Sequence, residues 1–197
     1  MDGAAYRWCN RLAIHTAWAH GLMTAVARYG IVVFPFLLLM AWWWARQADD
    51  PVGAVAPSVW AGAASLVGFV AVQIVGNVVD RARPYTVMPN ARLHVDRTGD
   101  FSFPSDHSTA AAAIAFGLVL ASRAIGRRWL GYTAVACALV LGFSRIYVGA
   151  HYPSDVLAGI ALGALVALAL APVAMQALRP PLGWLRRGVL RQLVAAS

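Results

Sequence analysis

Long apolar segments recur along this chain and constrain its fold more than any other feature. A helix needs roughly 20 mostly apolar residues to cross the hydrocarbon core of a bilayer. Five stretches approach that requirement: residues 29–45, 56–79, 105–121, 129–148 and 154–178. With 60% hydrophobic and 12% charged residues, the chain carries too much apolar surface for one soluble core. We therefore expect a single domain over residues 1–197, an all-α polytopic membrane helix bundle with about five to six transmembrane helices.

The N-terminal segment, residues 4–27, leaves the number of transmembrane helices open. Its large apolar side chains can line one helical face: Trp8, Leu12, Trp18, Leu22 and Val26. The arginines and histidines of this segment fall elsewhere on the helix. This pattern favours an amphipathic helix that lies in the membrane interface, with a sixth transmembrane helix as the alternative.

The charged residues predict the orientation of the bundle. The net charge of +8 comes entirely from arginine, since the chain has no lysine, and every acidic residue is an aspartate. No basic stripe follows a soluble segment, so no nucleic-acid partner is expected. Arginines gather in the turn at residues 123–128 and in the basic tail, residues 180–197, which the positive-inside rule places in the cytoplasm. The long loop, residues 85–103, then lies on the outer face.

Polar residues gather where the expected helices begin or end. Arg83 and Pro84 follow one apolar segment, and residues 104–107 open the next. Ser144 and Arg145 end a third segment, and residues 151–155 open the last one. Because the helices alternate in direction, these four places meet at one membrane face, where ionisable groups are costly and usually functional. We expect the active site there.

The residue types of this cluster suit a phosphate group. Arg83 and Arg145 offer planar, permanently charged donors for phosphate oxygens. Ser105 and the neighbouring backbone N–H groups stand at a helix start, where an anion is favoured. Of His107 and His151, one can attack phosphorus and the other can protonate the leaving oxygen.

Asp155 follows His151 by four residues and can share its helical face. A carboxylate that accepts a hydrogen bond from one ring nitrogen leaves the other nitrogen free to attack. Few carboxylates lie near these motifs and the chain has no glutamate, so we expect neither a metal nor another cofactor.

These motifs resemble the signature of the type 2 phosphatidic acid phosphatase superfamily, which is Lys-x6-Arg-Pro, Pro-Ser-x-His and Ser-Arg-x5-His-x3-Asp. The second and third motifs match at residues 104–107 and 144–155 with full spacing. The resemblance implies that His151 is the nucleophile that forms a phosphohistidine and that Asp155 orients it. It implies that His107 is the general acid and then the base. The resemblance also implies that Arg83, Ser105 and Arg145 bind the phosphoryl oxygens. We add Asp106 and Ser144, which lie in the same motifs, as further candidates for phosphate binding.

The first motif is incomplete, because the position of its lysine is Gly76. Either Arg81 or Asn77 takes the place of the lysine, or the site has fewer donors; Arg81 otherwise reaches lipid headgroups. We expect Asp100 to be a solvated loop residue or a turn residue. The missing lysine and Asp106 inside the second motif resemble the bacitracin-resistance branch of the superfamily.

That branch hydrolyses undecaprenyl diphosphate at the outer face of the bacterial cytoplasmic membrane, which recycles the carrier lipid for cell-wall synthesis. The resemblance therefore implies a polyprenyl diphosphate substrate, surrounding membrane lipids as partners and an active site that faces the periplasm or exterior. Two alternatives stay open. One is a phosphatase of another lipid phosphate, such as phosphatidylglycerol phosphate, phosphatidic acid or a lipid A phosphate. The other is a non-catalytic protein that binds or transports lipid phosphates. The oligomeric state is left open.

Overall fold

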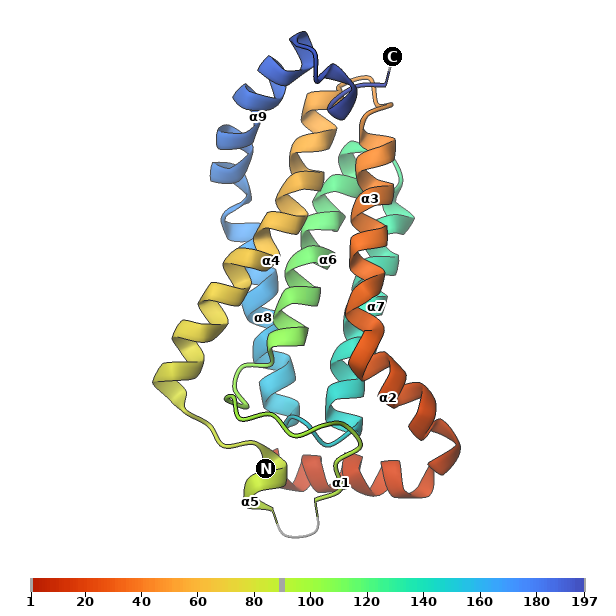
Figure 1. Cartoon of the computed structure of the whole chain (residues 1–197), viewed down its shortest axis with the longest axis vertical. Coiled ribbons are helices and arrows are strands. Elements are labelled where there is room, and N and C mark those ends of the chain that lie inside the picture. The colour runs from red at the N-terminus through yellow and green to blue at the C-terminus, as the bar shows by residue number, and fades with distance from the viewer. Residues whose placement is uncertain (1, 89–90, 197) are drawn as a thin grey trace.

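Five long helices pack side by side and form the body of the protein. The computed structural model describes residues 2–88 and 91–196, and this part of the chain contains helices and no strands. The bundle helices are α3 (Val33–Ala45), α4 (Pro51–Val79), α6 (Asp106–Ala124), α7 (Arg128–Tyr147) and α8 (Pro153–Ala169) (Figure 1). Helix α9 (Ala171–Arg187) follows α8 after a bend of 50°. The expected all-α bundle is confirmed.

Helix α6 occupies the centre of the bundle, against α4, α7 and α8. Small residues allow this close packing. A Cβ atom at Gly159 of α8 would lie 2.6 Å from the carbonyl oxygen of Ser105, and one at Gly163 would collide with the carbonyl oxygen of Thr109. These two glycines, four residues apart, therefore bring α8 against the start of α6, where the second and third motifs lie.

Three helical segments of the described chain are long and apolar enough to cross a membrane, Ala17–Ala45, Pro51–Val87 and Arg128–Tyr147. The bent pair α8 and α9 makes a fourth if it is counted as one span. Helix α6 does not qualify, although it runs through the middle of the bundle (Figure 1). The neighbouring helices bury much of its surface, so its composition of alanine, serine and threonine suits protein contacts and not lipid.

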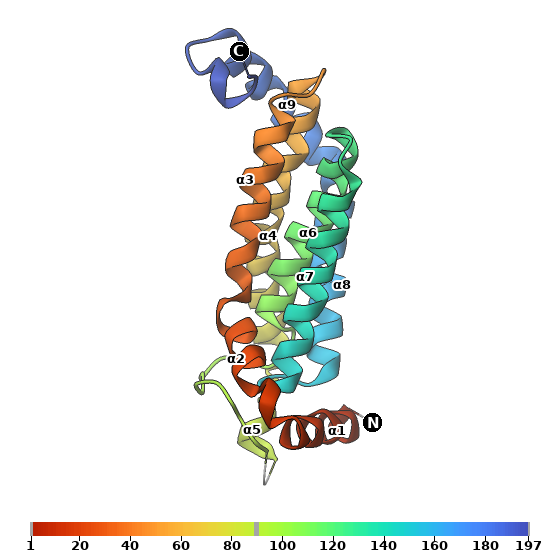
Figure 2. The same cartoon turned by 90° about the vertical axis from the view of Figure 1, so that its right-hand side faces the viewer.

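The N-terminal segment is divided and does not form one continuous amphipathic helix. Helix α1 (Asp2–His15) lies across one end of the bundle, close to perpendicular to the long helices (Figures 1 and 2). After a break at Thr16, a 3-10 turn (Ala17–Ala19), α2 (His20–Tyr29) and a second turn (Gly30–Val32) lead into α3. The residues from Ala17 onward thus belong to the first candidate span. Hydrogen bonds fix the break, since the Thr16 and Tyr147 hydroxyls lie 2.6 Å apart.

The same end of the bundle is covered by the chain between α4 and α6. Asp80 ends α4 in a left-handed conformation with φ 46°, and its N–H donates to the carbonyl oxygen of Gly76. The chain then runs through the short helix α5 (Pro84–Val87) and a long loop that returns beneath the bundle to α6 (Figure 1). Backbone hydrogen bonds attach this loop, from Ser102 to Arg81 at 2.8 Å and from His94 to Val148 at 3.0 Å. The opposite end carries the α6–α7 turn, α9 and the last 3-10 turn (Arg191–Leu193).

Candidate active site

The residues of the three motifs come together at the end of the bundle that the loop and α1 cover. They lie at the start of α6, the end of α7, the start of α8 and the segment after α4. Several are almost completely buried, although each carries a polar group: Arg83, Ser105, Ser144, Arg145, His151 and Asp155. The topology predicted from the sequence therefore places these residues at one end, as expected.

His151 is fully buried in the turn between α7 and α8. Its Nδ1 lies 2.8 Å from the carbonyl oxygen of Ser102, which can only accept, so Nδ1 carries the proton. Its Nε2 lies 3.1 Å from Nη1 of Arg83, which can only donate, so Nε2 presents its lone pair. Burial lowers the pKa of His151, and the charges of Arg83 and Arg145 lower it further. The ring is therefore neutral, with its lone pair on Nε2.

Asp155 is also fully buried, and it supports His151 partly through Ser102. Its Oδ2 lies 3.7 Å from Nδ1 of His151 and accepts a hydrogen bond of 2.6 Å from the Ser102 hydroxyl. It also accepts from the backbone N–H of Tyr152 at 2.9 Å, as part of a capping box at the start of α8. Ser102 thus connects His151 and Asp155, a contact that the sequence does not predict. Its carbonyl holds the ring, and its hydroxyl holds the carboxylate.

Arg81 does not reach toward lipid headgroups, which corrects the expectation from the sequence. Its Nη1 lies 2.7 Å from Oδ1 of Asp155 and 2.7 Å from the Ser154 hydroxyl. Its Nη2 lies 2.6 Å from the carboxylate of Asp2, the first residue of α1. A buried carboxylate needs a compensating charge, and Arg81 provides it for Asp155. The same contacts attach the N-terminus of α1 to the site.

Arg83 is 4% exposed, and its guanidinium is held on several sides. Besides His151, it donates to the carbonyl oxygens of Ala150 and Asp100, each at 3.2 Å. Its Nη2 forms an ion pair of 3.0 Å with the carboxylate of Asp100, which is half exposed. Asp100 is therefore more than a turn residue, because it neutralises the arginine that contacts His151.

His107 stands at the start of α6, with its side chain 30% exposed. Its Nδ1 lies 3.0 Å from Oδ1 of Asp106. Ser105 caps this helix, because its hydroxyl accepts from the N–H of Ser108 at 3.4 Å and from the Ser108 hydroxyl at 3.0 Å. The start of α6 thus presents one partly exposed imidazole beside the buried groups.

Three further residues are expected from the sequence to bind phosphate: Arg145, Ser144 and Asp106. Their hydrogen bonds differ. Arg145 donates from Nη1 to the carbonyl oxygen of Ala27 at 3.1 Å, while its buried Nε has no hydrogen-bond partner in the described residues. The Ser144 hydroxyl donates to the carbonyl oxygen of Leu141 within α7 at 2.6 Å. Neither that contact nor the pairing of Asp106 with His107 supports a phosphate-binding role for Ser144 or Asp106.

In the part of the chain that the structure describes, neither Arg81 nor Asn77 takes the place of the missing lysine, and the loop packs against Gly76. The aromatic ring of Phe101 packs on Gly76, where an added Cβ atom would lie 2.9 Å from it. Asn77 donates to the carbonyl oxygen of Gln73 within α4, and Arg81 is paired with Asp155. A cavity of about 200 Å³ remains beside Phe101, bounded by α4, the loop and Asp106.

Sequence and fold both relate the chain to known proteins. A family model described as the PAP2 superfamily matches residues 57–179. The chain is 29% identical over 167 residues to the undecaprenyl-diphosphatase BcrC of Bacillus subtilis strain 168, covering 84% of this chain and 80% of that protein. It is 32% identical over 146 residues to the putative undecaprenyl-diphosphatase YbjG of Escherichia coli K12, covering 74% and 69%.

Two solved structures share the fold. One is a transmembrane PAP2 type phosphatidylglycerolphosphate phosphatase from Bacillus subtilis, with a TM-score of 0.65, 19% identity, and coverage of 88% of this chain and 86% of that one. The other is LpxE from Aquifex aeolicus, with a TM-score of 0.62, 20% identity, and coverage of 89% and 94%. The family match covers more than half of the chain, and the fold agrees with it. This chain is therefore an integral membrane protein that belongs to the PAP2 superfamily.

Proposed function

We propose that the chain is a membrane phosphatase that hydrolyses undecaprenyl diphosphate to undecaprenyl phosphate and inorganic phosphate. The observation that carries the proposal is the environment of His151. A neutral, fully buried imidazole has its Nδ1 proton held by a carbonyl oxygen, and it presents Nε2 beside Arg83. Such an arrangement suits a nucleophile, whereas binding of a phosphate alone does not need one. The relatives BcrC and YbjG, both named for undecaprenyl diphosphate, favour this substrate.

The reaction has two steps that exchange one proton through His107. Nε2 of His151 attacks the terminal phosphorus and forms an N–P bond, while the bridging P–O bond breaks and His107 protonates the departing oxygen. His107 then removes a proton from water, whose oxygen bonds to phosphorus as the N–P bond breaks. The guanidinium groups of Arg83 and Arg145 stabilise the charge on the phosphoryl oxygens in both transition states.

For the substrate to bind this way, Nη1 of Arg83 must leave the lone pair of Nε2, and the carbonyl and carboxylate of Asp100 must release Arg83 in part. The phosphoryl group has the stronger charge and would replace the carboxylate, which is half exposed and free to turn toward solvent. The buried Nε of Arg145, which has no hydrogen-bond partner in the described residues, would be a second donor. The polyprenyl chain would lie along the apolar helices, with its headgroup at the covered end of the bundle.

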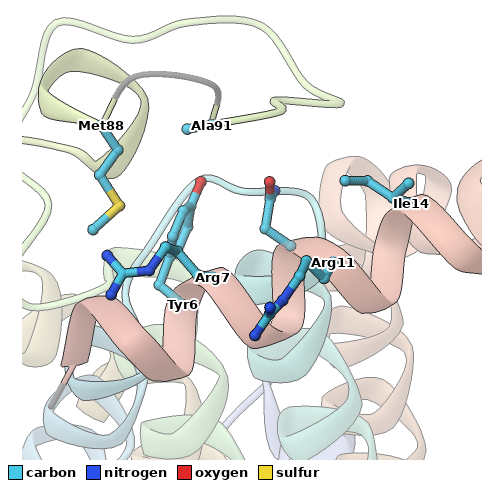
Figure 3. Close-up of a pocket in the computed structure, with 7 residues that line it drawn as sticks. Tyr6, Arg7, Arg11, Ile14, Met88 and Ala91 are labelled. Atoms are coloured by element: carbon cyan, nitrogen blue, oxygen red, sulfur yellow. The ribbon is translucent and has the colours of Figure 1, made fainter.

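We place this end at the outer face of the bacterial cytoplasmic membrane. The α6–α7 turn and the C-terminal segment, both rich in arginine, lie at the opposite end of the molecule, which the positive-inside rule assigns to the cytoplasm. The active end also has an arginine-lined surface, a pocket of about 340 Å³ between α1 and the loop (Figure 3). Arg7 and Arg11 border this pocket, where they would attract anionic lipids and substrates.

A second candidate substrate is a lipid A phosphate. A segment of 65 residues is 48% identical to the lipid A 1-phosphatase of Rhizobium johnstonii, although it covers 32% of this chain and 24% of that protein. The chemistry would be the same, since the polar residues of the site suit the phosphate group and do not distinguish the lipid chain.

The test is a measurement of kcat/KM for phosphate release by the purified protein in detergent, with a chelator present. The panel contains undecaprenyl diphosphate, phosphatidylglycerol phosphate, phosphatidic acid and lipid A. We expect the highest value for undecaprenyl diphosphate and no release by His151→Asn. His15→Asn, a change at an exposed histidine of α1, is the matched control. Activity in His151→Asn would reject the nucleophile, and preference for another lipid would replace the substrate. Binding without release by the wild type would make the protein a lipid-phosphate binder.

A further inference from the structure

The carboxylate of Asp106 pairs with the imidazole of His107, its neighbour in sequence. Oδ1 of Asp106 and Nδ1 of His107 lie 3.0 Å apart, and both side chains are about one third exposed, at 32% and 30%. Adjacent residues of a helix do not normally face each other. The contact is possible here because Asp106 is the first residue of α6, directly after the capping residue Ser105.

We infer that Asp106 is a positioning residue for the proton-transfer group and not a ligand of the phosphate. This inference rests on the proposed function. A carboxylate and a phosphoryl group carry like charges, so direct contact between them is unfavourable. The contact with His107 is favourable, because the carboxylate can only accept and Nδ1 then donates. This fixes the tautomer in which Nε2 is the atom that gives and takes the catalytic proton.

The site would then contain two imidazoles, each held at Nδ1 by a different group. Nδ1 of His151 donates to the Ser102 carbonyl, and the Ser102 hydroxyl donates to Asp155. His151 is fully buried and would react in its neutral form. His107 is held by a carboxylate, which compensates the positive charge of the ring in its protonated state. The buried ring is thereby suited to nucleophilic attack, and the partly exposed ring to proton transfer.

This assignment predicts a dependence on the leaving group. When the substrate is a diphosphate, the departing group is a phosphate monoester, which is stable as an anion and needs little protonation. When the substrate is a monophosphate ester, the departing group is an alkoxide, which depends strongly on the proton from Nε2 of His107. A change that disturbs only the proton donor should therefore slow the monophosphate more than the diphosphate.

The experiment compares farnesyl diphosphate with farnesyl phosphate, which share one chain, in the full-length protein in detergent. For Asp106→Ala we expect kcat to fall about 10- to 100-fold with farnesyl diphosphate and more with farnesyl phosphate, while KM changes less than about threefold. Asp106→Asn, whose amide oxygen can still accept from Nδ1, should recover part of the loss. Asp106→Ala should add little to the loss caused by His107→Ala, because both act on one proton transfer.

Three results would overturn the inference. One is a large rise in KM at unchanged kcat, which would mean that Asp106 takes part in binding. Another is an equal loss in kcat/KM for both substrates, since kcat/KM reports the step in which the leaving group departs and not the later hydrolysis that both substrates share. The third is an undiminished loss in the His107→Ala background. Asp96→Ala, at an exposed aspartate paired with Arg28, controls for the loss of one negative charge. If the wild type releases phosphate from farnesyl phosphate alone, the diphosphate assignment fails. The His107→Ala comparison would still decide the role of Asp106.

Discussion

Replacing Ser102 by alanine tests how the buried carboxylate supports the nucleophile. The substitution removes the hydroxyl that donates to Oδ2 of Asp155 at 2.6 Å and leaves the backbone carbonyl that accepts from His151. Both side chains are fully buried, so water does not readily take the place of the hydroxyl. The carboxylate keeps its hydrogen bonds from the Tyr152 backbone and from Arg81.

The size of the effect follows from these contacts. A hydrogen bond to a charged group contributes about 1.5–3 kcal/mol. Since about 1.4 kcal/mol corresponds to a factor of ten in rate, complete transfer of that energy to the transition state would give roughly a 10- to 100-fold loss. Because Ser102 still holds Nδ1 through its carbonyl, we expect the lower limit, about a tenfold decrease in kcat. KM should change little, since the lost hydroxyl contacts Asp155 and not the phosphoryl group.

The measurement is steady-state phosphate release from undecaprenyl diphosphate, with thermal unfolding recorded on the same samples. Ser122→Ala is the matched control, because Ser122 is equally buried but donates to Val119 within α6 at the opposite end of the bundle. If Ser102→Ala keeps the wild-type kcat, the serine does not connect Asp155 to His151. A rise in KM at constant kcat would mean that Ser102 binds the phosphate, and it would refute the role of its hydroxyl as a support for Asp155.

Three further predictions concern the same end of the bundle. Arg81→Ala should lower kcat at least tenfold and lower the unfolding temperature, because it leaves the charge of Asp155 uncompensated, and unchanged values would reject the pairing. Gly76→Lys, which restores the lysine of the first motif, should give no gain in kcat/KM and should cost about 1–3 kcal/mol of stability against the ring of Phe101. Finally, burial lowers the pKa of His151 from its ordinary value of 6.5, so the unfolded chain binds the proton first as the pH falls. The stability that comes from its neutral ring is present above pH 6.5 and is lost on acidification, and His151→Gln should remove this part of the pH dependence of thermal unfolding.

The sequence predicts the bundle well because a helix that faces lipid must be apolar, and this requirement is visible in a short stretch of sequence. Each helix that faces lipid must be apolar over its whole length, which a window of residues reveals. Hydrophobicity alone does not predict the N-terminal segment. Whether it lies in the membrane interface or crosses the membrane depends on its contacts with the end of the bundle. Tyr6 donates to the carbonyl oxygen of Gly149, and Asn10 pairs with the backbone of Arg92, so α1 is held by tertiary contacts. Those partners are far away in sequence and leave no local pattern.

The motif residues could be found from sequence because their spacing is fixed by helix ends. Ser102 and Asp100 could not, since they lie in an irregular loop whose contacts are set by its path beneath the bundle. One signal was available for Arg81. It shares a short non-helical segment with Arg83, directly after the left-handed residue Asp80 that ends α4. Because this segment runs under the bundle, both arginines lie near the site, where Arg81 pairs with Asp155 and Arg83 contacts His151.

The missing lysine shows why an incomplete motif needs a structure before it can be interpreted. Read from the sequence, Gly76 means that the site lacks one donor unless a neighbour supplies it. In the structure, Phe101 occupies the space against α4 that a side chain at position 76 would need. The residues after Phe101 then place the Ser102 carbonyl on His151 and its hydroxyl on Asp155. A glycine at position 76 therefore allows the loop to approach α4 closely, and the loop supplies the support of the nucleophile. Glycine, where the family motif has lysine, thus leaves room for Phe101 against α4. Gly76→Lys combined with Phe101→Ala should recover stability relative to Gly76→Lys alone, without raising kcat.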